Sequence, residues 1–447
     1  MKCVVGSTGV FALALTALAA TPAESQDTPA PSSAVRDREQ EPTVTMDEAV
    51  EMALVVSPTM AVSEGTVSTS EWGERAAWAE FLPSLSLSTG ASRSSSQRFD
   101  PNTNRVVTGA ASENYNAGLT ASIDLFTAGR RGAQLRESRA ITAAAEAVVV
   151  EQRFAVTVVA KSAFFQVLRA DELIGVAETQ LEQARTGFEA AVQRLTVGSA
   201  TRSDSLRARL EVNQAEQALL EATTQRRAAA YALGALTGTA GPVGARLDVP
   251  LDVRPITYNE GELVEMALGS APAMRSAEAN VTAAGAALGA SRTQYFPTIG
   301  ATGRYSFSNT QPAFENATRS WNVGLSLSYP IFNRFAREDS KARAAVDLNV
   351  AEAELDNRRL EIRANVVRAL DQAGLSEQRL GLSEEALEVA REDMRVQEER
   401  YGLGASTILE LITSQIALAQ AEQGLVNARY DYQIARAELE ALVGREL

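Results

Sequence analysis

Two of the residue types that enzymes use most often for chemistry, histidine and cysteine, are missing or nearly missing from this chain of 447 residues. There is no histidine, and Cys3 is the only cysteine. This excludes histidine-based acid–base catalysis, Ser–His and Cys–His nucleophile pairs, and most zinc sites. No phosphate-binding loop and no cluster of metal ligands stands out either. We therefore predict no catalytic residue, no cofactor and no metal site, and we expect that the protein is not an enzyme.

The polar residues that do stand out lie in two glycine-containing turns, "RLTVGSATRSD" (Arg194–Asp204) and "RYGLGASTILE" (Arg400–Glu410). Each turn follows a long helical pattern and precedes a returning helical pattern of ~35 residues. Glycine supplies the left-handed cap at the end of the first helix. Either Thr201 or Ser203, and either Ser406 or Thr407, can cap the helix that follows.

The two turns belong to a longer internal repeat. "VEMALVVSPTM" starts at Val50 and "VEMALGSAPAM" starts at Val264, an offset of 264 − 50 = 214 residues. The offset falls to 206 by the two turns, where Gly198 matches Gly404. Such self-similarity predicts two copies of one structural unit. The difference of eight residues lies between positions 85 and 126, so we expect a longer loop in the first copy.

Four short segments alternate between polar and apolar residues, as β-strands with two different faces do. The polar face is Ser, Thr, Asn and Gly, and the apolar face is Leu, Val, Ile and aromatic, which suits transmembrane β-barrel strands. Four strands cannot close a barrel, so several copies must share one. The alternative is two hairpins on a soluble core. The segments are Leu82–Gly90, Asn114–Phe126, Phe296–Ser308 and Ser320–Phe332, and we expect polar loops at 91–113 and 309–319.

The segments after the strands follow the spacing of long coiled-coil helices. Two heptad series in the second copy lie about 200° apart on the helix, hence on opposite sides. A helix with two apolar flanks fits the wall of a tube, and a solid bundle core is the competing interpretation. One series is Ala373, Leu380, Leu387, Met394 and Tyr401; the other is Leu375, Leu382, Val389, Val396 and Leu403.

The chain divides into five expected parts. Residues 1–23 have the pattern of a secretory signal peptide, and residues 24–43 read as a disordered leader. Repeat 1 spans residues 44–238, an inter-repeat segment spans 239–260, and repeat 2 spans 261–447. The net charge of −14 argues against nucleic acid as a partner.

From about Val44 to Gly444 the chain resembles the TolC family of outer-membrane efflux proteins. The matching motifs are "VEMAL…P" twice, "LPSL" and "FPTI", "DLF" and "PIF", and "VGSATRSD" and "LGASTILE". The resemblance implies a mainly α-helical fold with a transmembrane β-barrel part. Three copies contribute four strands each to a twelve-stranded barrel in the outer membrane, and their helices form a tunnel across the periplasm. The implied partners are a periplasmic adaptor protein and an inner-membrane pump.

The resemblance also implies a gate at the periplasmic end. By position, Tyr401 matches the tyrosine at the family's helix tips, and Asp204 matches the residue of the first repeat that accepts a hydrogen bond from that tyrosine. Glu410 matches the first of the acidic positions that form rings at the gate. The family's second acid falls on Thr413 and a linking arginine falls on Ser406, so we expect weaker closure and a lower cation preference. The adaptor-contacting tip residues are Gly198, Ser199, Thr201, Gly404, Ala405 and Thr407.

Two of the gate residues also have a purely structural interpretation. Glu410 can be an exposed carboxylate at the start of a helix, and Tyr401 can be part of the coiled-coil core. For the whole chain, we expect a passive export channel for small molecules such as drugs, with metals and proteins as further cargo classes. The alternative is a periplasmic coiled-coil adaptor or structural protein, which leaves the strand alternation unexplained.

Overall fold

The computed structural model describes residues 41–102, 104–108, 111–248, 255–313, 315 and 317–445. The expected signal peptide and nearly all of the expected leader lie outside this part of the chain. Thr43, at the end of that leader, pairs with Gly244 in a short parallel bridge between β1 (Thr43–Val44) and β6 (Gly244–Ala245).

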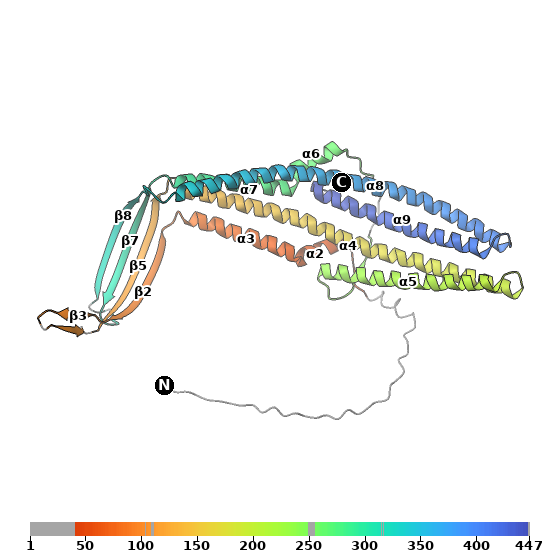
Figure 1. Cartoon of the computed structure of the whole chain (residues 1–447), viewed down its shortest axis with the longest axis horizontal. Helices are drawn as coiled ribbons and strands as arrows, with labels where there is room; N and C mark the ends of the chain where they lie inside the picture. The colour runs from red at the N-terminus through yellow and green to blue at the C-terminus, as the bar shows by residue number, and fades with distance from the viewer. Residues whose placement is uncertain are drawn as a thin grey trace, which may run out of the picture. The chain divides into compact units, whose positions relative to one another are not determined.

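Two copies of the same series of elements follow one another, which confirms the predicted repeat (Figure 1). The long helices have 67 residues in both copies, and the returning helices have 36. The first copy contains α2 (Met46–Val56), α3 (Pro58–Ala79), β2 (Ser84–Ser94), β5 (Ser112–Phe126), α4 (Arg130–Thr196) and α5 (Arg202–Thr237). The second contains α6 (Glu260–Ser270), α7 (Pro272–Thr293), β7 (Thr298–Asn309), β8 (Thr318–Ser328), α8 (Ala336–Gly402) and α9 (Ile408–Val443).

The repeated "VEMAL…P" phrase encodes a helix break. The letters VEMAL lie in α2 and α6, and the prolines that follow, Pro58 and Pro272, stand at the start of α3 and α7. Proline has no N–H to donate within a helix, but it fits the first helical position. Capping boxes open α2 and α6, with Thr45 and Asn259 as the N-cap residues.

The expectation of a purely polar loop at 91–113 is wrong. β2 continues to Ser94, and a second hairpin, β3 (Gln97–Asp100) with β4 (Arg105–Thr108), projects before β5 begins at Ser112. The sequence did not reveal these strands because they bury no apolar face: Phe99 and Val106, which pair across the hairpin, are 54% and 62% exposed. This extra hairpin lies within the region where the first copy is longer than the second.

The four main strands form one antiparallel sheet in the order β2-β5-β7-β8. The strand register forms rows across the sheet in which the residues have similar polarity. One row joins Leu87, Leu119, Tyr305 and Trp321, and the next row joins Ser88, Gly118, Ser306 and Ser320. The sheet therefore has an apolar face and a polar face, and β2 and β8 are its two edges.

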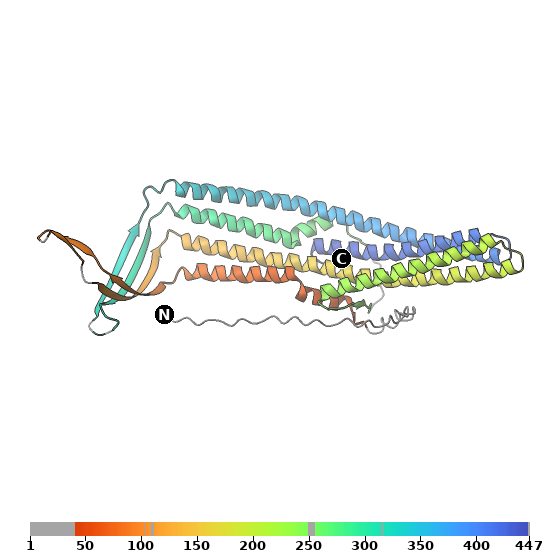
Figure 2. The same ribbon diagram turned by 60° about the horizontal axis from the view of Figure 1, so that its bottom comes forward.

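The helices run side by side away from the sheet (Figures 1 and 2). Near the strands, α3 packs on α4, α4 on α7, and α7 on α8; toward the tips, α5 packs on α4, α4 on α9, and α9 on α8. None of the helices in the described part of the chain is both long and apolar enough to cross a lipid bilayer.

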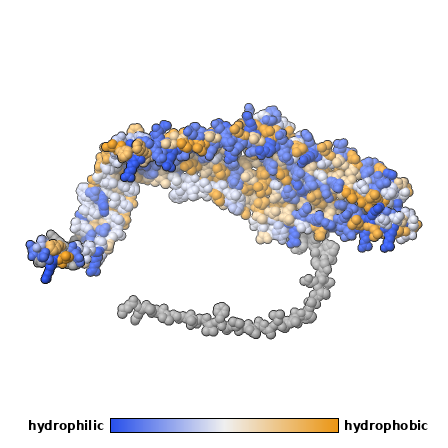
Figure 3. Space-filling model, viewed as in Figure 1, coloured by the Kyte–Doolittle hydropathy of each residue, from blue (hydrophilic) through white to orange (hydrophobic). Residues whose placement is uncertain are grey.

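The two heptad faces of α8 have different environments. The five residues of the Ala373–Tyr401 series are all buried. In the opposite series, Leu382 is 66% exposed and Val389 is 64% exposed. Apolar patches are visible over the helical part in Figure 3. A solid bundle core within one chain is therefore excluded for this face, which is left free for another packing partner.

Candidate gate at the helix tips

Each long helix ends in a turn with the same local design. Gly198 and Gly404 have positive φ angles of 79° and 75°, which a residue without a Cβ adopts at little cost. Thr201 and Thr407 then cap α5 and α9, each accepting a hydrogen bond from the third residue of its helix. The caps are thus Thr201 rather than Ser203, and Thr407 rather than Ser406.

Asp204 is engaged within its own helix. Its Oδ2 atom accepts hydrogen bonds from the Thr201 backbone N–H at 2.9 Å and from the Thr201 hydroxyl at 2.8 Å. These two hydrogen bonds lower the pKa of Asp204 below its usual value. Asp204 is therefore a charged N-terminal capping residue of α5.

Tyr401 lies in an apolar cluster between the two tips. The side chain is 6% exposed and belongs to a core cluster that includes Ala208 of α5 and Ile408 of α9. Burial raises the pKa of the Tyr401 hydroxyl; the charge of Arg194 opposes this shift, and the charge of Asp204 adds to it. That hydroxyl has no hydrogen-bond partner among the described residues, so the contact with Asp204 that the family resemblance implies is not formed here.

Arg194 provides the direct link between the two tips. Its guanidinium lies 4.0 Å from the centre of the Tyr401 ring. It donates hydrogen bonds to the carbonyl oxygens of Tyr401 and Gly402, at the C-terminal end of α8. A cation there satisfies free carbonyls and complements the helix dipole. Arg194 of the first repeat thus holds the end of the long helix of the second.

The equivalent arginine of the second repeat makes a different contact. Arg400 donates to the carbonyl oxygen of Ala405, 3.4 Å away, within its own turn. Each arginine stands four residues before the capping glycine of its turn. This shared position is the sequence signal for Arg194, which was not among the predicted gate residues. Sequence alone does not distinguish the two arginines, because only the packing of the hairpins brings Tyr401 to one of them.

Glu410 has an exposed carboxylate at the start of α9. Its backbone N–H donates to the Thr407 hydroxyl at 3.3 Å, and its side chain points away from the buried cluster. Thr413, at the position of the family's second acid, donates its hydroxyl to the carbonyl oxygen of Leu409. Ser406, at the position of the linking arginine, has a buried hydroxyl oxygen without a partner among the described residues.

The six predicted adaptor-contacting residues are all exposed, so the turns are accessible to another protein. They are Gly198, Ser199, Thr201, Gly404, Ala405 and Thr407.

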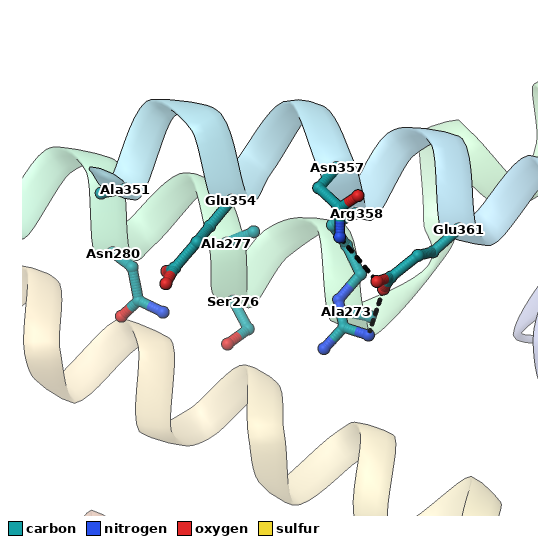
Figure 4. A pocket seen from close by; sticks show the side chains of 9 residues that line it. All are labelled: Ala273, Ser276, Ala277, Asn280, Ala351, Glu354, Asn357, Arg358 and Glu361. Carbon is teal, nitrogen blue, oxygen red and sulfur yellow. Dashed lines mark hydrogen bonds and ion pairs between the residues drawn. The ribbon is translucent and has the colours of Figure 1, made fainter. Parts of the chain in front are cut away.

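Away from the tips, a polar hollow of about 390 Å³ lies between α7 and α8. Figure 4 shows Glu354 of α8 and Asn280 of α7 directed into it, while Glu361 is bound by Asn357 and Arg358. In the described part of the chain, no three His, Cys, Asp or Glu side chains are placed to hold a metal ion.

Comparison with known proteins covers nearly all of the described structure. The sequence profile of the family described as "Outer membrane efflux protein" matches residues 49–239 and 263–445. Protein CyaE of Bordetella pertussis is 27% identical over 361 residues, which are 78% of this chain and 72% of that protein. The pyoverdine export outer membrane protein OpmQ of Pseudomonas aeruginosa is 26% identical, over 89% of this chain and 83% of its own length.

Among solved structures, CusC, described in connection with transmembrane channel formation, superposes with a TM-score of 0.77. The match covers 90% of this chain and 92% of CusC at 20% sequence identity, so it is a likeness of fold.

Proposed function

Because the chain belongs to the outer membrane efflux protein family, we propose that it is a passive export channel of the outer membrane that extends into the periplasm. The membership confirms the resemblance predicted from the repeated motifs. OpmQ, a pyoverdine export outer membrane protein, and CusC, described in connection with transmembrane channel formation, support this function.

The main support for the proposal is that the four-stranded sheet has two open edges. Within the described residues β2 and β8 each pair on one side only, and the sheet has one polar and one apolar face. Open strand edges are not tolerated in lipid, because their backbone groups stay unpaired. Pairing β8 of one copy with β2 of the next satisfies both edges and places the polar faces around a water-filled lumen.

Three copies are the assembly we propose, giving twelve strands from four per chain. The same arrangement covers the exposed heptad face of α8 that includes Leu382 and Val389. The helices of the three copies then form the wall of a periplasmic tunnel. A periplasmic adaptor that binds the exposed tips, and an inner-membrane pump that supplies the energy, complete the export system.

Closure of this tunnel is assigned to the tips. Tyr401 lies at the contact between the two hairpins, where the charge of Asp204 acts on it, and Glu410 carries an exposed charge at the start of α9. Three Glu410 carboxylates around a shared axis repel one another and attract cations. The proposed cargo is a small molecule handed over by the pump, with metal ions and proteins as the other classes to be tested.

The second candidate function is a periplasmic coiled-coil adaptor or structural protein. It accounts for the long helices, but it leaves the two-faced sheet with exposed Leu87 and Trp321 without a role. An adaptor also gives no reason for the close match to a channel-forming fold.

Single-channel conductance of the purified full chain in planar bilayers tests the proposal, together with the mass of the detergent-solubilised particle. We expect discrete currents and a particle of three chains. A folded, helical protein that never inserts or conducts contradicts the channel function and supports the adaptor alternative. Conduction by an assembly of another size contradicts the trimer alone.

A further inference from the structure

The polar face of the four-stranded sheet is almost uncharged. Along β2, β5, β7 and β8 this face consists of Ser, Thr, Asn and Gly with two exceptions, Asp124 and Arg304. Asp124 lies at the end of β5 beside the helices, and Arg130 neutralises it at 3.3 Å. Arg304 is therefore the remaining charge on this face within the described strands.

Arg304 occupies the middle of the sheet. It is the seventh of the twelve residues of β7. Its neighbours in the same row are Thr120 of β5 and Asn322 of β8. No carboxylate of the described residues makes an ion pair with it, and its side chain is exposed on the polar face. A guanidinium keeps its charge at any physiological pH.

The neighbouring strand gives this guanidinium room to lie along the sheet. A Cβ built on Gly118 of β5 would be 3.7 Å from Nη2 and 3.8 Å from Nε of Arg304, and 3.5 Å from the Ser88 hydroxyl. The guanidinium thus crosses over Gly118, where no side chain intervenes. Two small hydroxyl-bearing residues, Ser88 and Thr120, lie nearby.

We propose that Arg304 forms an anion-binding station inside the membrane part of the channel. The inference rests on the proposed function: closing the barrel from three copies brings three Arg304 side chains around one lumen. A charged ring within low-dielectric walls concentrates ions of the opposite sign. Carboxylate and phosphate groups both match the arginine fork, so the station takes solutes that bear either group.

This station contrasts with the rest of the chain. The net charge is −14, and Glu410 places negative charge at the opposite end of the tunnel. An anionic solute that has passed the acidic tips therefore meets attraction, rather than further repulsion, before it leaves the membrane. In this arrangement the sheet favours anionic cargo, and the tips discriminate between ions at the entrance of the tunnel.

A thiol placed beside Arg304 reports the local potential without depending on the gate. Cys3 is the only native cysteine, and Ser88 lies on the polar face, across Gly118 from the guanidinium. The full chain with Cys3→Ser and Ser88→Cys, reconstituted in liposomes, is treated from outside with a negatively or a positively charged thiosulfonate of similar size. The ratio of the two reaction rates is compared with and without Arg304→Gln. Arg319→Gln is the matched control, because Arg319 pairs with Phe307 on the apolar face of the same sheet.

We expect Arg304→Gln to lower the ratio of anionic to cationic rates by about threefold to tenfold at low salt, and added salt to shrink this effect. Citrate, as a tricarboxylate probe, should protect the thiol in the parent protein but not in Arg304→Gln. The control should leave both results unchanged. A ratio that is the same in Arg304→Gln, or a thiol that reacts with neither reagent, overturns the inference. Conductance of the unmodified protein, measured in parallel, separates that outcome from failure of the channel function itself.

Discussion

The contact of Arg194 with the end of α8 joins the hairpin of α4 and α5 to the hairpin of α8 and α9. Any opening that separates these two hairpins must break it. Replacing Arg194 by alanine removes the stacking on Tyr401 and the hydrogen bonds to the carbonyls of Tyr401 and Gly402, while it leaves the apolar cluster below intact. We therefore expect Arg194→Ala to favour an open tip.

The size of the effect follows from the contacts that are lost. A cation over an aromatic ring contributes about 1 kcal/mol at a partly exposed site. Hydrogen bonds from a charged donor contribute about 1.5 kcal/mol or more. Because the Arg194 side chain is only partly buried, solvent screening reduces the sum to about 2 kcal/mol. That is about a 30-fold change in the ratio of open to closed tips.

The assay is the open probability of single channels in planar bilayers, with Arg400→Ala as the matched control. Arg400 has the same position in its turn but contacts only Ala405 of that turn. We expect long-lived large currents for Arg194→Ala and near-native currents for Arg400→Ala. Arg194→Lys should be intermediate, since it keeps the charge but loses the planar fork. Equal currents from both alanine variants refute the reasoning and place the opening motion between protomers instead.

Three further predictions concern charge and packing. Glu410→Gln should lower the cation preference of the reversal potential in a salt gradient, since an exposed charge near the proposed channel axis is lost. Burial raises the pKa of Glu211 above the ordinary glutamate value of 4.5, so its contribution to the stability of the fold falls as the pH rises above 4.5. Glu211→Gln should therefore raise the midpoint of thermal unfolding near pH 7.5 but hardly change it near pH 4. Gly234→Ala should lower the midpoint or prevent folding, because its Cβ would overlap the carbonyl oxygen of Gly241.

Each of these three has its own control. An unchanged reversal potential in Glu410→Gln removes this residue from the proposed gate. Glu216→Gln replaces a half-exposed carboxylate on the same helix as Glu211, and a pH-dependent gain there would contradict the burial argument. Gly175→Ala replaces a helical glycine with open space around it, and it should preserve or slightly raise the midpoint. A loss equal to that of Gly234→Ala would point to backbone effects rather than overlap.

Features that depend only on neighbouring residues along the chain could be predicted from the sequence. Alternation with a period of two predicted the two-faced strands, because successive side chains of a strand point to opposite faces whatever lies beyond them. The capping turns at Gly198 and Gly404 were predicted for the same reason, since φ angles and helix caps are local requirements. The repeat needed only the self-similarity of the sequence.

Other features depend on which segments pack against one another, and the periodicity of the sequence does not reveal that. The two heptad series of α8 look alike as patterns, yet Leu387 is buried and Val389 is exposed. Arg194 and Arg400 are equivalent by position, yet one crosses to Tyr401 and the other stays in its turn.

The sequence by itself thus determined the elements, their duplication and the two faces of the sheet, because each follows from local stereochemistry and residue periodicity. Only the tertiary structure decided which helix face is left for a partner and which arginine links the hairpins. It also decided that Arg304 lies across Gly118. These depend on distances between residues far apart in the chain, which are set by the packing of whole helices and by strand register.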